Sequence, residues 1–235
     1  MIAILDSGIG GRTIEIAVRA LLPGVHLRYF RDSANFPYGD KSPAEVVRII
    51  DENCGKLVAE GARLIVLACN SASVVSLAHL RRKYSIPFVG VVPAVKPAAA
   101  LTRSRQIAVF GTELTSRSAA LQDLIDRFCQ GITVHKIALP GLAEAVEAGD
   151  TPRVSEIVRR TWAAYERFGI DVVVLGCTHY TQARSEIRHV LGPGVQLIDS
   201  DAAVARQVKR VWEALLREGG EAALASGCDA SASQH

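Results

Sequence analysis

The sequence predicts an α/β protein of two pseudo-symmetric lobes, each a mainly parallel sheet flanked by helices, with a site in the cleft between them. Short apolar, β-branched runs alternate with helical periodicities, as in parallel strands joined by helical crossovers. Two of these runs, at residues 64–68 and 172–176, end at a cysteine that small polar residues follow. A similar series of elements begins again after Val92 and Pro93, which predicts the second lobe.

The elements of the first lobe are predicted by alternating strand and helix signals. Its predicted strands are residues 2–5, 26–31, 64–68 and 87–92. The glycine turn DSGIGG follows the first strand, and a helix follows the turn. This turn does not match the dinucleotide pattern GxGxxG, because Thr13 stands in place of the third glycine, so we expect no nicotinamide cofactor. A second helix begins after Ser42, the predicted N-cap, with Pro43 and Glu45 in its first turn.

The second lobe repeats the pattern. Its predicted strands are residues 106–110, 132–138, 172–176 and 195–198. Its predicted helices are residues 94–101, 115–128 with Thr115 as the cap, 139–149, 151–168 and a segment around 187–191. A final helix to about residue 216 is expected to return to the first lobe. Residues 1–92 with 202–235 then form one lobe and residues 93–201 the other, and the small, polar tail from residue 218 is expected to fray.

The composition is typical of a globular protein that acts on a small molecule. Its 235 residues are 49% hydrophobic and 22% charged. The formal net charge of +3 is not concentrated in a basic run, so we expect no nucleic-acid partner. No apolar stretch reaches the roughly 18 residues of a membrane span, and no cleavable leader is evident. We therefore expect a cytoplasmic protein without a membrane partner.

The cysteines predict reduced thiols rather than disulfides or a metal centre. They are odd in number and widely scattered, and they show no spacing typical of a zinc site. Their positions are 54, 69, 129, 177 and 228.

Cys69 and Cys177 are the candidate functional residues, because open parallel sheets bind ligands at the carboxyl ends of their strands. Either cysteine alone could be a small buried hydrophobe. Polar residues directly after both thiols are not required by core packing, however. Two thiols on opposite lobes could remove a proton from one face of a stereocentre and return one to the other face, since thiol and thiolate are both accessible near neutral pH.

Neighbouring polar residues would complete such a site. Asp6 and His179 are the titratable groups expected beside the thiols, where either can relay protons. Asp6 could equally cap the glycine turn, and His179 could be a hydrogen-bonded residue of the pocket wall. Short polar side chains at strand ends or helix starts could hold an α-carboxylate and an ammonium group, or simply cap helices: Ser7, Asn70, Ser71, Thr115 and Thr178.

Two other classes of function fit the same residues. A cysteine hydrolase would use Cys177 or Cys69 as its nucleophile and His179 as its base, and would need only one of the thiols. A non-catalytic amino-acid-binding protein would keep the polar residues and tolerate the loss of either thiol.

The ordered motifs resemble those of the glutamate racemases in the cofactor-independent aspartate/glutamate racemase superfamily. The resemblance covers about residues 2–210. It rests on DSGIGG at Asp6, PYG at Pro37, ACNSAS at Ala68, GVVPAVKPA at Gly90, VEAG at Val146, GCTHY at Gly176 and IDS at Ile198.

The resemblance implies interconversion of L- and D-glutamate by two cysteine bases, Cys69 and Cys177, without pyridoxal phosphate or metal. Asp6, Glu147 and His179 would be supporting acid/base residues. The implied substrate contacts are Ser7, Pro37, Tyr38, Gly39, Asn70, Ser71 and Thr178. Aspartate or another acidic amino acid is the alternative substrate, and the presence of both cysteines disfavours a related one-cysteine decarboxylase. The implied role is to supply D-glutamate for bacterial peptidoglycan, in the cytoplasm, as a homodimer.

The chain departs from the family pattern at several points. Ser71 stands where threonine is usual, and its hydroxyl preserves the chemistry. Thr181 and Gln182 replace the usual proline and apolar residue, so the helix after Cys177 is expected to start differently. Some family members carry an extension before the first strand and use it for regulation by a cell-wall precursor. This sequence starts directly with the first predicted strand, so we do not expect that regulation here.

Overall fold

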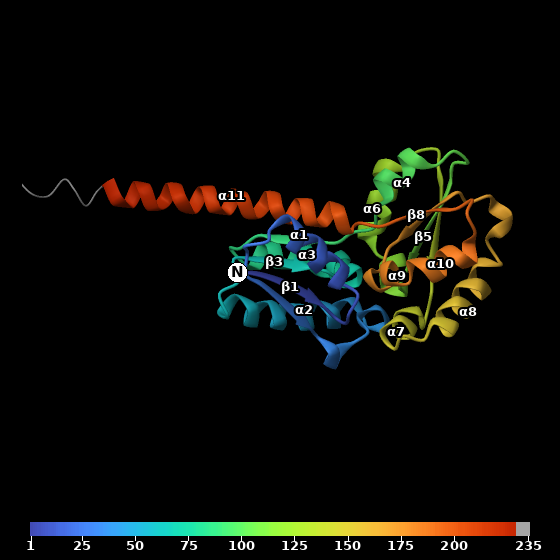
Figure 1. Cartoon of the computed structure of the whole chain (residues 1–235), viewed down its shortest axis with the longest axis horizontal. Coiled ribbons are helices and arrows are strands. Elements are labelled where there is room, and N and C mark those ends of the chain that lie inside the picture. The colour runs from blue at the N-terminus through green and yellow to red at the C-terminus, as the bar shows by residue number, and fades with distance from the viewer. Residues whose placement is uncertain (229–235) are drawn as a thin grey trace, which may run out of the picture.

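The structure, a computed structural model, describes residues 1–228, and side chains as far as Glu218. It contains two four-stranded sheets in which every strand pair is parallel (Figure 1). Their orders, β2-β1-β3-β4 and β6-β5-β7-β8, are the same when the second set of strands is renumbered from one. The predicted fold class, two similar parallel α/β lobes, is confirmed.

The two central strands of the first sheet are buried on both faces, which explains their almost continuously apolar sequences. Its strands are β1 (Ile2–Asp6), β2 (Leu27–Arg31), β3 (Leu64–Leu67) and β4 (Phe88–Gly90). Its helices are α1 (Arg12–Leu21), α2 (Pro43–Ala59) and α3 (Asn70–Lys83). Alternate residues serve opposite faces: Leu5 and Leu67 pack with α2 and α3, whereas Ile4 and Val66 pack with α1. Ser42 caps α2 as predicted, accepting the Glu45 N–H at 3.2 Å.

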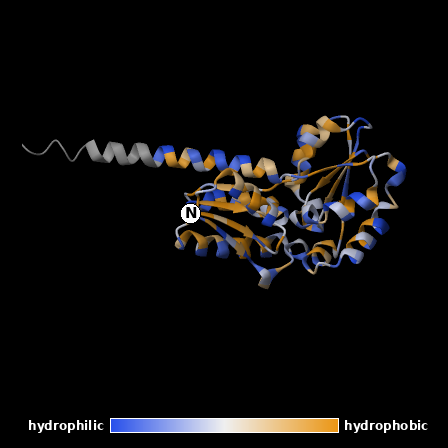
Figure 2. Ribbon diagram, in the orientation of Figure 1, coloured by the Kyte–Doolittle hydropathy of each residue, from blue (hydrophilic) through white to orange (hydrophobic). Residues whose placement is uncertain are grey.

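The second sheet is covered in the same way. Its strands are β5 (Gln106–Gly111), β6 (Thr133–Ala138), β7 (Val172–Leu175) and β8 (Gln196–Ile198). Its helices are α4 (Val95–Leu101), α5 (Glu113–Ser116), α6 (Ala119–Phe128), α7 (Leu142–Glu147), α8 (Thr151–Trp162), α9 (Thr178–Gln182) and α10 (Arg184–Leu191). Phe110 and Leu175 pack on the face covered by α7 to α10, and Val109 and Val174 on the face covered by α4 and α6. Figure 2 shows mostly apolar residues along the strands of both sheets.

The last helix, α11 (Asp201–Cys228), returns from the second sheet and packs along α1 (Figure 1). Val204, Val208 and Trp212 join the core on that face of the first sheet. The helix extends beyond the predicted end at residue 216, and residues 229–235 of the predicted tail lie outside the described part of the chain. The exact lobe boundaries stay a prediction.

Three helix predictions in the second lobe were wrong in detail. The predicted helix 115–128 is two helices, and Thr115 lies inside α5 instead of capping it. Thr112 caps α5 and Ser118 caps α6, each accepting the backbone N–H three residues ahead. The helix predicted to end at residue 168 ends at Trp162 and is followed by a separate 3-10 turn. Two helices rather than one follow Cys177.

No helix within residues 1–228 combines the length and the apolar character that crossing a bilayer requires.

Candidate active site

Cys69 and Cys177 occupy equivalent places in the two sheets. Cys69 follows β3 and is the N-cap of α3, and Cys177 follows β7 and is the N-cap of α9. Each thiol-bearing residue is 7% exposed. Burial raises the pKa of the Cys69 thiol well above its ordinary value, and the charges of Asp6 and Cys177 raise it further.

His179 and Glu147 form a hydrogen-bonded pair next to Cys177. The Nε2 atom of His179, a residue only 3% exposed, lies 2.7 Å from Oε2 of Glu147. Burial disfavours the imidazolium, but hydrogen bonds to Cys177 and Glu147 outweigh it and raise the pKa of His179 to about 10. The imidazole is thus protonated across the neutral range, and a positive charge stands beside the Cys177 sulfur.

Glu147 also binds the first lobe. Its Oε2 accepts the backbone N–H of Ile9 at 2.9 Å, and its Oε1 pairs with the Arg31 guanidinium at 2.5 Å. Burial would raise the pKa of Glu147, but the contacts with His179 and Ile9, aided by the charge of Arg31, lower it to about 2. The carboxylate of Glu147 is consequently a fixed negative charge that joins the two lobes.

The glycine loop, defined as residues 7–12, lies directly against this pair. A Cβ atom on Gly8 would fall 2.3 Å from Glu147 Oε2, and one on Gly10 would fall 2.6 Å from His179 Nδ1. The Gly10 position also faces Thr178, the first residue of α9, whose Oγ1 would lie 2.7 Å from that Cβ. Glycine is required here because the backbone approaches the second lobe too closely for any side chain.

Asp6 accepts hydrogen bonds from the glycine loop and also lies among the candidate groups. It is completely buried, and its carboxylate accepts the N–H of Ser7 at 2.8 Å and of Gly11 at 2.6 Å. Burial raises the pKa of Asp6 above its ordinary value, although the charge of His179 and the two backbone donors oppose this. The hydroxyl of Ser7 acts to lower the pKa of the Cys69 thiol.

Small polar side chains join the lobes on the Cys69 side. The hydroxyl of Ser71 lies 2.9 Å from that of Thr112 and 3.4 Å from that of Thr115. The amide nitrogen of Asn70 is buried without a hydrogen-bond partner among the described residues. An unpaired buried donor is costly, so this amide is available to a ligand.

The PYG segment lies at the same junction. Tyr38 is buried, and its hydroxyl donates to Asp32 at 2.7 Å, so the hydroxyl is already engaged within the first lobe. Burial raises the pKa of that phenol, and the Asp32 carboxylate adds to the effect. Pro37 directly precedes a 3-10 turn formed by Tyr38–Asp40. A Cβ on Gly39 would lie 2.5 Å from the methyl group of Thr112. This close approach explains the glycine.

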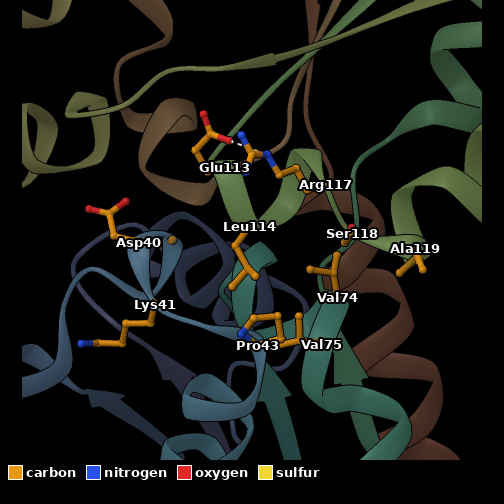
Figure 3. Close-up of a pocket in the computed structure, with 12 residues that line it drawn as sticks. Asp40, Lys41, Pro43, Val74, Val75, Glu113, Leu114, Arg117, Ser118 and Ala119 are labelled. Carbon is orange, nitrogen blue, oxygen red and sulfur yellow. Dashed lines mark ion pairs between the residues drawn. The ribbon is translucent and has the colours of Figure 1, made fainter.

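A cavity of about 740 Å³ opens between the lobes but excludes both thiols. Figure 3 shows Lys41 and Pro43 on the side of the first lobe and the ion pair of Glu113 with Arg117 on the opposite side. The candidate site is therefore the region around Cys69, Cys177 and His179, and not this cavity. In the described part of the chain, no cluster of three or more His, Cys, Asp or Glu side chains is arranged to hold a metal ion.

Sequence reasoning missed three contributors to the junction: Arg31, Thr112 and Gln182. Arg31 is the last residue of β2 and Thr112 follows a glycine, and neither position differs in the sequence from an ordinary strand end or cap. Gln182 did carry a signal, as a polar residue where the family pattern has an apolar one, but its contact with the carbonyl of Ile9 spans 173 positions.

The comparisons with known proteins agree over most of the chain. The model of the family described as Asp/Glu/Hydantoin racemase matches residues 12–208. A glutamate racemase of Roseiflexus sp. is 43% identical over 89% of this chain and 78% of its own. One of Pseudomonas aeruginosa is 40% identical over 96% of this chain and 84% of its own. The structure of Escherichia coli glutamate racemase with L-glutamate and the activator UDP-MurNAc-Ala has a TM-score of 0.83 and 35% identity, covering 90% of this chain and 82% of that one.

Proposed function

Since the chain belongs to the Asp/Glu/hydantoin racemase family and is an amino-acid racemase, we propose that it interconverts L- and D-glutamate by proton transfer between two thiols, without a cofactor. The observation that carries this proposal is the equivalent position of Cys69 and Cys177 after the third strand of two like sheets. A reaction that inverts a stereocentre needs one proton-transfer group on each face, and the two lobes supply one each.

The two cysteines have different charged neighbours. Contacts with Cys177 and Glu147 raise the pKa of His179 to about 10, which places a positive charge beside Cys177. Cys69 is buried beside the Asp6 carboxylate, which keeps its pKa high and favours the thiol. The Cys177 thiolate would remove the α-proton from one face and become a thiol. The Cys69 thiol would donate its proton to the opposite face of the same carbon and become a thiolate, and the reverse reaction exchanges these roles.

The remaining residues fit a supporting function. Glu147 and Asp6 hold charge on either side of the substrate, Glu147 through His179 and Asp6 beside Cys69. The unpartnered amide of Asn70 supports its assignment to a polar group of the substrate. The start of α3, directly after Cys69, offers free backbone N–H groups, which favour a carboxylate. The further proposed contacts are Ser7, Pro37, Tyr38, Gly39, Ser71, Thr115 and Thr178.

The proposal extends to the biological role. We propose that the enzyme supplies D-glutamate for peptidoglycan, in the cytoplasm, as a homodimer. The similarity to bacterial glutamate racemases supports this role. Restored growth of a D-glutamate-requiring bacterium expressing the chain would test the role, and light scattering of the purified protein would test the dimer.

Isotope exchange tests the reaction itself. The protein is incubated in deuterated water, without added cofactor, with L-glutamate, D-glutamate or L-aspartate. Because different thiols take and give the proton, early product is expected to carry deuterium at the α-carbon while the remaining substrate keeps its proton. Aspartate is the specificity control. Faster turnover of aspartate than of glutamate would contradict the assigned substrate, and no exchange with any of them would contradict the racemase.

A further inference from the structure

Gln182, the last residue of α9, reaches from the second lobe to the glycine loop of the first. Its amide Nε2 donates to the carbonyl of Ile9 at 2.5 Å and lies 3.4 Å from the carbonyl oxygen of Gly10. Both neighbours are acceptors, so the NH₂ end of the amide must face them, since its oxygen would be repelled. The orientation of this side chain is therefore fixed by chemistry.

The same peptide segment is held by a second contact from the same lobe. Glu147 accepts the N–H of Ile9 at 2.9 Å, so both polar backbone groups of Ile9 are bound by side chains of the second lobe. The carbonyl of Ile9 also accepts the N–H of Arg12 at 3.0 Å, which its two lone pairs permit. We call the contacts of Glu147 and Gln182 with Ile9 the Ile9 clamp.

The clamp lies where the two halves of the site meet. The glycine loop carries Ser7 immediately after Asp6, and its glycines touch His179 and Glu147 without room for a side chain. Cys69 and Cys177 are only 7% exposed, so a substrate the size of an amino acid cannot reach them unless the lobes separate. The clamp contacts must then break and form again when substrate enters and product leaves.

We propose that Gln182 is a positioning residue of the racemase, which acts with Glu147 through Ile9 to hold the glycine loop in register with His179 and to favour the closed arrangement of the lobes. This inference deepens the proposed function and rests on it. Gln182 itself touches backbone and not the reacting atoms.

Hydrogen exchange of the substrate-free protein tests the clamp directly. Two variants of similar size, Gln182→Met and Gln182→Glu, remove the donor, and the second places a carboxylate against two carbonyl oxygens. Amide exchange in the peptide covering residues 7–12 is expected to accelerate about threefold in the first and about tenfold in the second, since hydrogen-bonded amides exchange through local opening. Gln122→Met and Gln122→Glu are matched controls, because Gln122 lies on α6 and its side chain bonds, among the described residues, Asp126 and Lys136 of the same lobe.

Kinetics provide the second measurement. We expect kcat/KM for glutamate to fall about tenfold in Gln182→Glu, with most of the change in KM, because closure is tied to binding. Exchange and kcat/KM within twofold of the wild type in both Gln182 variants would overturn the proposal. If circular dichroism shows that Gln182→Glu does not fold, the amide exchange and kcat/KM of Gln182→Met alone test the proposal. Absence of glutamate turnover in the wild-type protein would overturn the proposed function alone, since the exchange rates measure the clamp without substrate.

Discussion

The Nε2 atom of His179 lies 2.7 Å from the Oε2 atom of Glu147, the same oxygen that accepts the N–H of Ile9. One carboxylate oxygen therefore links the imidazole beside Cys177 to the glycine loop of the other lobe. Because Arg31 engages the second oxygen, the carboxylate is held in one orientation. The same side chain therefore contributes both to the charge beside Cys177 and to the contact between the lobes.

Replacing Glu147 with glutamine should alter the pH dependence of the reaction. The carboxylate helps to raise the pKa of His179 to about 10, so its loss lowers that pKa, and the imidazolium deprotonates closer to neutral pH. The alkaline limb of the kcat/KM profile is expected to move to lower pH, and activity at pH 8 to fall about tenfold or more. Glu144→Gln on the same helix is the control and should keep the wild-type profile.

The same substitution should change stability in a pH-dependent way. The pKa of Glu147 is lowered from 4.5 to about 2, so its carboxylate stabilises the folded state above pH 4.5, and this contribution is lost as the pH falls toward 2. The difference in Tm between wild type and Glu147→Gln should therefore shrink on acidification. Because solvent screens this partly exposed group, we expect about 2–4 °C at neutral pH. A difference independent of pH, measured by calorimetry, would contradict this linkage.

Substituting either of the two proposed catalytic thiols should abolish racemization while preserving the fold. Cys69→Ala and Cys177→Ala each remove a small side chain at a strand end, and each is expected to lower turnover of glutamate by about 10³-fold or more in both directions. Circular dichroism checks the fold. Cys129→Ala, a buried cysteine on the far side of the second sheet, serves as the control. Wild-type turnover in either thiol variant would eliminate the two-base mechanism.

Gly10→Ala should inactivate the enzyme by steric clash alone. The added Cβ would lie 2.6 Å from His179 Nδ1, a distance that real side chains do not tolerate. Gly10 is not among the residues with positive φ, so alanine strains no backbone angle, and the loss follows from displacement of the loop or the imidazole. We expect turnover of glutamate to fall about 100-fold or more. Gly24→Ala, with no atom within 4 Å of the new Cβ, should behave as wild type.

The two sheets and the positions of both cysteines at strand ends could be predicted because their signals are local. A buried parallel strand needs a run such as Leu64–Leu67 or Val172–Leu175, and the ligand side of such a strand is its carboxyl end. The cap of α2 was equally readable, since Ser42, Pro43 and Glu45 occupy adjacent positions with distinct roles.

What the sequence could not show are contacts between distant positions and choices among equivalent local signals. Glu147 and Ile9 are 138 positions apart, and no local pattern marks the pair. Thr112, Thr115 and Ser118 are all competent caps, and packing of α5 and α6 on separate surfaces decided which of them act. The small residues after Glu218 suggested a frayed end, yet α11 continues to Cys228.

His179→Asn should affect the two directions of reaction unequally in kcat but not in kcat/KM. His179 is the charged group next to Cys177, so its loss should most impair the direction in which Cys177 removes the proton. Enantiomers have equal free energy in water, so the equilibrium constant is unity and kcat/KM must be the same for L- and D-glutamate in every variant. The asymmetry must therefore appear as unequal kcat values balanced by unequal KM values. Polarimetry with each enantiomer measures kcat and KM for both directions. Equal losses of kcat in the two directions would contradict the proposal that His179 assists Cys177 and not Cys69.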